Sequence, residues 1–161
     1  MNGSARPPFY LVDGHSVIHA WPDLLHLHAR RPRQARDELI RRLTAFQDAQ
    51  AARIVLVFDG RGSRLAAEAS EPAGIQVVYS GRGASADSVI EKLVATHAAT
   101  HDLTVVTADQ AERAAVTALG AWWCHPDEFL RRTGSALGET RRALDRTKPA
   151  RGFRLGEAAG W

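Results

Sequence analysis

Cysteine and long hydrophobic runs are the two features that this chain most conspicuously lacks. The single cysteine, Cys124, excludes a disulfide scaffold and a cysteine-rich zinc site. No apolar run approaches the roughly 20 residues that a transmembrane helix needs, so no membrane span is expected. The opening residues, MNGSARPPFYLVDG, also lack the apolar stretch of a secretory signal. These absences predict a cytoplasmic protein with no membrane partner.

Lysine is nearly as scarce. Only Lys92 and Lys148 are present among 21 basic residues, so the other 19 are arginines, and the net charge is +3. Arginine binds phosphate through two parallel hydrogen bonds and stacks on bases, which favours a nucleic-acid partner. A genome-wide bias toward alanine and arginine explains the same composition, so the composition alone leaves both interpretations open.

The length and the apolar pattern predict one α/β domain. The chain has 161 residues, 45% of them hydrophobic, which suits a single domain of roughly 150 residues. Short β-branched runs alternate with helical stripes, a pattern typical of a parallel sheet covered by helices on both faces. The strands are expected at 9–12, 54–58, 75–79, 103–106 and 121–124, and the helices at 33–50, 85–98, 109–119 and from Pro126 onward.

The domain is expected to occupy residues 9–145, between an N-terminal extension (1–8) and a basic C-terminal tail (146–161). Residues 60–74 are rich in glycine, serine and arginine and predict a long connection between the second and third strands. Neither an internal repeat nor a second domain is expected.

Acidic residues follow the predicted strands. Asp13 and Asp59 end the first two strands, and Asp109 comes shortly after the fourth. The third strand leads into a helix whose first turn carries Asp87, with Glu91 four residues later on the same helical face. Because parallel strands end at one edge of a sheet, and ligands bind there in open α/β folds, these five acids are expected to gather at one site.

Gathered carboxylates repel one another unless a cation neutralises them. Hard carboxylate oxygens favour Mg²⁺ or Mn²⁺ over zinc, and such an ion beside a basic surface is suited to phosphodiester hydrolysis. Turn formation by Asp-Gly and helix capping by Asp87 and Asp109 are the alternative roles for these residues. These alternative roles explain any single acidic residue well, but they explain less well why all of the acids are expected at one edge of the sheet.

The histidines give weaker indications. His26 and His28 are two residues apart and therefore off a common helical face, so a metal pair is not expected there. His15 stands beside Asp13, where it would contact a substrate or lie in an exposed turn. The other histidines show no suggestive ligand spacing.

Four segments, taken in order, resemble the YacP-like NYN domain family. The opening LVDGHSVIHAWPDL is similar to the family's V-D-G-Y-N-hydrophobic-I-x-A-W-P-x-L, with Ala-Trp-Pro at 20–22 its most specific part. The segments IVLVFDG, VVYSGRGASADSVIEKL and VVTADQAER match the later strands, and the resemblance runs from about Tyr10 to Leu130. It implies a three-layer PIN-like (NYN) nuclease fold with a central, mostly parallel five-stranded sheet.

For function, the resemblance implies a Mg²⁺- or Mn²⁺-dependent endoribonuclease that cleaves single-stranded RNA or mRNA, with the ribosome as a partner. Asp13, Asp87 and Asp109 match the metal-binding acids of the family, and Asp59 and Glu91 are expected to support the catalytic site.

Substrate contacts are expected around these acids. His15 and Ser16 follow the first acid, and a serine hydroxyl can donate a hydrogen bond to an aspartate or a phosphate. Arg61, Arg64 and Arg82 are expected at the mouth of the site, where they would steer the RNA backbone.

The chain departs from the family pattern at two places. His15-Ser16 replaces the Tyr-Asn of the namesake motif, and Arg113 stands where many NYN nucleases carry an acid; the adjacent Glu112 is expected to point elsewhere on its helix. Because of both departures, an alternative function is kept: a PIN-like RNA- or ribosome-binding module of little or no catalytic activity. A third hypothesis is a metal-dependent phosphatase or phosphotransferase. Such an enzyme is disfavoured because no D-x-D motif follows the first strand and no lysine lies near the fifth strand.

Overall fold

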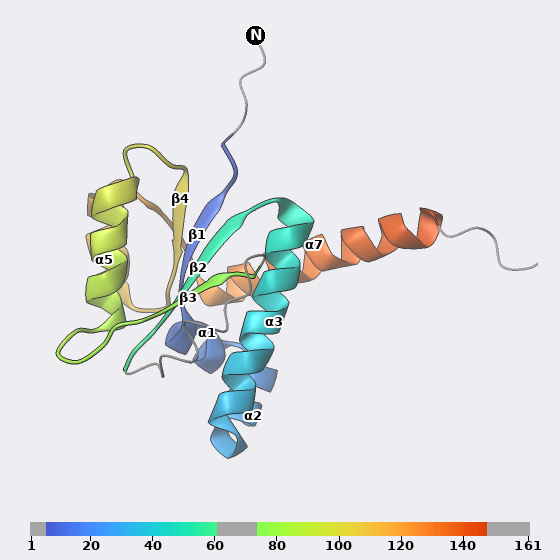
Figure 1. Cartoon of the computed structure of the whole chain (residues 1–161), viewed down its shortest axis with the longest axis horizontal. Helices are drawn as coiled ribbons and strands as arrows, with labels where there is room; N and C mark the ends of the chain where they lie inside the picture. The colour runs from blue at the N-terminus through green and yellow to red at the C-terminus, as the bar shows by residue number, and fades with distance from the viewer. Residues whose placement is uncertain (1–5, 61–73, 148–161) are drawn as a thin grey trace, which may run out of the picture.

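The computed structural model describes residues 6–60 and 74–147 (Figure 1). In this part of the chain, helices lie between the first and second, the third and fourth, and the fourth and fifth strands, as the sequence predicts, and all five strands run parallel in the order β3-β2-β1-β4-β5. The strands are β1 (Phe9–Asp13), β2 (Arg53–Phe58), β3 (Gln76–Tyr79), β4 (Leu103–Val106) and β5 (Trp122–Cys124). The helices are α1 (Gly14–Ala20), α2 (Pro22–Arg30), α3 (Pro32–Gln50), α5 (Ala86–His97), α6 (Gln110–Ala118) and α7 (Pro126–Thr147).

The sheet separates two hydrophobic layers, so the predicted three-layer α/β fold is confirmed. Successive strand residues face opposite layers: Val12 and Leu56 pack with α1, α2, α3 and α7, whereas Leu11 and Val57 pack with α5 and α6. Figure 1 shows α5 on one side of the sheet and α1, α3 and α7 on the other. The strands read as continuous apolar runs because both of their faces are buried.

Helices α1 and α2 are additions to the predicted elements. α1 begins directly after β1, and the Asp13 side chain caps it by accepting a hydrogen bond from the Ser16 backbone N–H. Gly14 makes this tight turn possible, since a Cβ at this position would overlap the ring of Phe58. The turn therefore fixes the carboxyl end of β1 against the start of a helix.

Trp21 anchors the α1–α2 corner in the core. Its side chain is fully buried, it packs against Phe129 of α7, and its indole Nε1–H donates to the carbonyl oxygen of Pro126 at 2.9 Å. Pro126 occupies the first turn of α7, where its missing N–H leaves no helical bond unmade, as the sequence predicts. The Ala-Trp-Pro segment thus joins the beginning of the domain to its last helix.

The ends of the chain fall partly outside the described residues. α7 runs to Thr147, so its last two residues belong to the segment that the sequence predicts as a tail. Residues 148–161, 1–5 and 61–73, the last of which includes Arg61 and Arg64, lie outside the described residues. No helix in the described part of the chain is both long and apolar enough to cross a membrane.

Candidate functional site

The candidate site lies at the carboxyl ends of the central strands. β1 is in the middle of the sheet, with β2 on one side and β4 on the other. From β1 to β3 the strands are added on one side of β1, and β4 and β5 are then added on its other side. Ligands bind at such switch points because the loops that follow the two strands diverge and leave a crevice. Asp13 ends β1 here, and Thr107 follows β4 directly.

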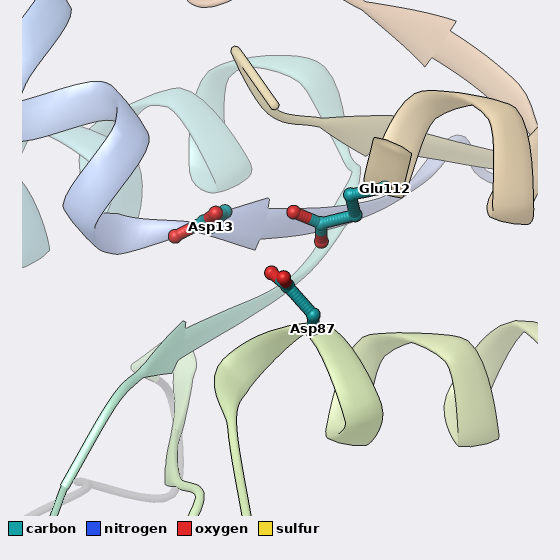
Figure 2. A group of neighbouring side chains, drawn as sticks. All are labelled: Asp13, Asp87 and Glu112. Atoms are coloured by element: carbon teal, nitrogen blue, oxygen red, sulfur yellow. The ribbon is translucent and has the colours of Figure 1, made fainter. Parts of the chain in front are cut away.

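Three carboxyl groups from three elements converge at this point. Asp13 from β1, Asp87 from the first turn of α5 and Glu112 from the first turn of α6 each offer an oxygen, and these oxygens lie within 4.8 Å of one another (Figure 2). Figure 2 shows the three side chains close together, with the carboxyl groups of Asp87 and Glu112 on the side that faces Asp13. A set of carboxylate oxygens at this spacing suits a hard divalent cation.

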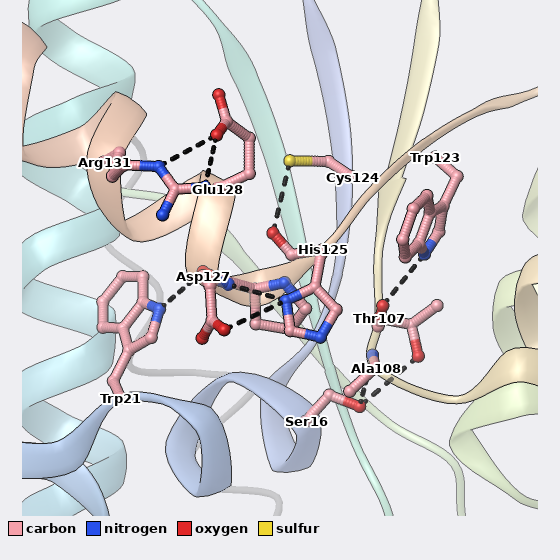
Figure 3. A network of polar contacts seen from close by, with 11 residues as sticks. Ser16, Trp21, Thr107, Ala108, Trp123, Cys124, His125, Asp127, Glu128 and Arg131 are labelled. Carbon is pink, nitrogen blue, oxygen red and sulfur yellow. Dashed lines mark hydrogen bonds and ion pairs between the residues drawn. The ribbon is translucent and has the colours of Figure 1, made fainter.

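Hydroxyl groups hold Asp13 in place. Ser16 Oγ donates to Asp13 Oδ2 at 3.0 Å. It also accepts a hydrogen bond from the Ala108 backbone N–H at 3.2 Å, and Figure 3 shows this contact. Thr107 Oγ1 also lies 3.4 Å from Asp13 Oδ2. Burial raises the pKa of Asp13, the Ser16 hydrogen bonds oppose that rise, and the charge of Asp87 adds to it. Ser16 therefore links the end of β1 to the loop that follows β4.

Glu112 is the most unusual member of the group. Glu112 is only 2% exposed. Its Oε2 accepts a hydrogen bond from Thr107 Oγ1 at 2.8 Å, whereas Oε1 is buried without a hydrogen-bond partner among the described residues. Burial, together with the nearby charges of Asp13 and Asp87, raises the pKa of Glu112 to about 9. An unpartnered buried carboxyl oxygen beside two other acids is the arrangement that a bound cation relieves.

The expectation that Glu112 points elsewhere on its helix is wrong. Asp109 caps α6, with its Oδ1 accepting from the Glu112 backbone N–H at 2.9 Å, so Glu112 is the third residue of the helix. It lies one turn before the buried Val116, on the helical face that packs against the sheet. The spacing of Glu112 and Val116, and the D-x-x-E pattern of a helix start, are the sequence signals that pointed to this orientation.

The other predicted acids lie around this group rather than in it. Asp109 is exposed and its carboxylate caps α6. Asp59 is exposed, and its Oδ1 accepts from the Ala86 backbone N–H at 2.6 Å, which ties the end of β2 to the start of α5. Glu91 is partly buried one turn beyond Asp87. Asp87 itself does not cap α5, because Ser85 and Ser88 form its capping box.

The predicted substrate contacts are placed only in part. His15 is exposed on α1, beside Asp13, and Arg82 is exposed in the loop between β3 and α5. Arg113, one residue after Glu112, places its guanidinium 3.9 Å from the centre of the Trp123 ring. Trp123 in turn donates its Nε1–H to the Thr107 carbonyl oxygen at 2.9 Å. Trp123 therefore links the exposed Arg113 guanidinium to the loop that follows β4.

A sequence profile of the YacP-like NYN domain matches residues 10–157 of the chain. The chain belongs to the YacP-like NYN domain family. It is 32% identical over 122 residues to the uncharacterized protein YacP of Bacillus subtilis, covering 75% of this chain and 72% of that protein. These NYN domains are part of the PIN-like nuclease family.

Solved structures of relatives agree with this family assignment. The crystal structure of Rae1 (YacP) from Bacillus subtilis superposes with a TM-score of 0.74 at 30% identity, covering 86% of this chain and 80% of that one. The crystal structure of its W164L mutant gives a TM-score of 0.73 at 28% identity, covering 86% and 82%. The fold that the YacP-like resemblance implies is therefore confirmed, with a sheet that is wholly parallel.

Proposed function

We propose that this NYN domain is a metal-dependent endoribonuclease that cleaves single-stranded RNA. The observation that carries the proposal is the buried, unpartnered Oε1 of Glu112 beside Asp13 and Asp87 at the switch point of a nuclease-family sheet. Asp13, Asp87 and Glu112 would hold Mg²⁺ or Mn²⁺, with Glu112 in the place that the sequence analysis gave to Asp109. The ion would supply an activated water and would neutralise charge on the phosphate.

The protein's own groups have separate tasks in this proposal. Ser16 and Thr107 orient the carboxylates through their hydroxyl groups, which fixes the ligand oxygens before a cation arrives. Asp59 holds the start of α5 and thereby positions Asp87. Arg82 and Arg113 contact the RNA phosphates, together with Arg61 and Arg64 in the connection outside the described residues. Arginines at a rim position the backbone without reading bases.

The family resemblance extends the proposal to the substrate's setting. The YacP branch suggests mRNA as the substrate, the ribosome as a partner and the cytoplasm as the location. A 3′-labelled mRNA cleaved by the chain only when ribosomes are present would support this extension, and equal cleavage of free RNA would contradict it. The assay needs the full chain, since residues 148–161 carry Lys148, Arg151 and Arg154.

The decisive test is cleavage of a labelled single-stranded RNA with Mg²⁺, with Mn²⁺ and with EDTA, both free and on ribosomes. We expect internal cuts that need the metal and that disappear in Asp87→Asn and Glu112→Gln. Asp48→Asn, which changes an exposed acid on α3 in the same way, is the matched control and should cut normally. Crystals soaked in Mn²⁺ should show an ion with oxygens at roughly 2.0–2.6 Å.

A second candidate function is an RNA- or ribosome-binding module that does not cut. Arg113 favours it, because a cation stacked on Trp123 replaces the acid found in many NYN nucleases. RNA binding without cleavage under every metal and ribosome condition would establish this alternative. Metal-dependent cleavage that Glu112→Gln abolishes would exclude it.

A further inference from the structure

Three histidine rings form a row on α1 and α2, next to the acidic group but separate from it. His15 and His19 are one helical turn apart on α1, with ring centroids 4.1 Å apart. His28 comes from the end of α2, and its ring centroid lies 5.4 Å from that of His19. The sequence spacing gives no indication of this grouping, because it is the α1–α2 corner that brings the ring of His28 next to that of His19.

Two of the histidine rings have a nitrogen that is available to a metal ion. His28 Nδ1 is buried and has no hydrogen-bond partner in residues 6–60 and 74–147. Burial lowers the pKa of His19, and electrostatic repulsion from His15 and His28 lowers it further. The lowered pKa keeps the His19 ring neutral. A neutral imidazole offers a nitrogen lone pair, the group that binds zinc and related metals.

We propose that His15, His19 and His28 bind one Zn²⁺ ion. Imidazole nitrogen is a preferred zinc ligand, whereas Mg²⁺ prefers oxygen, so this site and the acidic group select different metals. Three protein nitrogens leave a fourth position of the tetrahedron for water or a substrate oxygen. The proposal does not depend on the nuclease function and stands or falls separately from it.

A common ion would require the three imidazole rings to rotate. In the described chain, the acids are the group whose ligand atoms already lie within 4.8 Å, so the imidazoles must turn to converge. His15 and His19 are exposed and free to change rotamer, while the partly buried His28 supplies the more fixed nitrogen. A bound ion would then tie α1 to α2. Because α1 begins immediately after Asp13, it would also fix the helix that adjoins the acidic group.

The test is a zinc titration of the full chain in competition with a chromophoric chelator. An Asp87→Asn background weakens the acidic group as a rival zinc site, so the histidines can be measured alone. We expect one zinc per chain. His19→Ala, His15→Ala and His28→Ala should each weaken the affinity about tenfold or more. Circular dichroism of each variant establishes that it is folded, and the first two replace exposed side chains.

Two matched controls come from the same chain. His26 is exposed on α2, two residues from His28, and His26→Ala should leave the affinity unchanged. His97 and His101 form another pair one turn apart, with ring centroids 5.3 Å apart, and His101→Ala should also have no effect. Zinc affinity that survives His19→Ala, or that is lost in His101→Ala, would overturn the proposal. So would crystals at saturating zinc with no anomalous peak among the three rings.

Discussion

The Thr107 hydroxyl donates a 2.8 Å hydrogen bond to Glu112 Oε2, and this contact connects the end of β4 to the first turn of α6. The same oxygen of Thr107 accepts a hydrogen bond from the Asp109 backbone N–H at 3.1 Å. One fully buried threonine thus organises the loop from which the third carboxylate enters the site. Its position immediately after a strand, where polar residues meet ligands, is consistent with that task.

Glu112 gives the metal-free protein a pH-dependent stability. Its pKa is raised from 4.5 to about 9, so the folded state holds a proton that the unfolded chain releases. The resulting stabilisation is complete below pH 4.5 and is lost as the pH rises toward 9. Urea unfolding of the EDTA-treated protein from pH 5 to pH 9 measures it.

Glu112→Gln serves as the control for this titration, since glutamine keeps the shape and the neutral state at every pH. We expect the slope of stability against pH to flatten in the variant. Saturating Mg²⁺ should flatten it in the wild-type chain as well, because a bound cation takes the place of the proton. An unchanged slope in Glu112→Gln would assign the pH dependence to other groups.

Ser16→Ala should weaken metal binding without unfolding the domain. The substitution removes the hydroxyl that contacts Asp13 Oδ2 and accepts from the Ala108 N–H. Loss of such an orienting contact lowers metal affinity by about 10- to 100-fold. Mn²⁺ binding followed by electron paramagnetic resonance gives the affinity directly. Ser135→Ala, an exposed serine on α7, is the matched control, and equal effects of the two substitutions would refute the orienting role.

Arg113→Ala should weaken RNA binding at the rim while leaving Mn²⁺ affinity unchanged. Its guanidinium is held 3.9 Å over Trp123, so it presents a fixed charge to a phosphate. The slope of log affinity against log salt should fall by roughly one unit or less for single-stranded RNA. Arg113→Lys should restore the charge but not the planar stack, and so recover only part of the affinity. Full affinity in Arg113→Ala would place the RNA path elsewhere.

Trp21→Ala should be strongly destabilising, by about 3–5 kcal/mol, as expected for a large aromatic removed from a core. The residue is fully buried, and its loss also leaves the Pro126 carbonyl oxygen without its indole donor. The midpoint of urea unfolding gives the change. Trp122→Ala is the comparison, because Trp122 is 69% exposed, and its effect should be within about 0.5 kcal/mol.

The sheet was predictable because its strands are short apolar runs with no alternation, and the helices that precede β2, β4 and β5 favour a parallel arrangement. Asp13 was predictable as a site residue for the same reason, since it ends the first run. Glu112 was missed although the sequence carries the signals, because its orientation depends on where α6 begins, and a shift of one residue turns a side chain by about a quarter of a helical turn.

The histidine row shows a different limit. His15 and His28 are thirteen positions apart, and only the corner at Trp21 brings their helices together. α1 has just seven residues and carries glycine, serine and two histidines, so its apolar stripe is too short to predict a helix. Contacts that depend on a bend between two short helices have no periodic signature in the sequence.

The central position of β1 has a consequence for the order in which the site is assembled. β1 leaves the ribosome before both of its neighbours, so it can pair with β2 first and with β4 only later. Asp13 is therefore synthesised first among the three carboxylates, and Glu112 last. A nascent chain that ends before α6 contains two of the acids and an open strand edge. The three carboxyl groups can therefore come together only when most of the domain has been made.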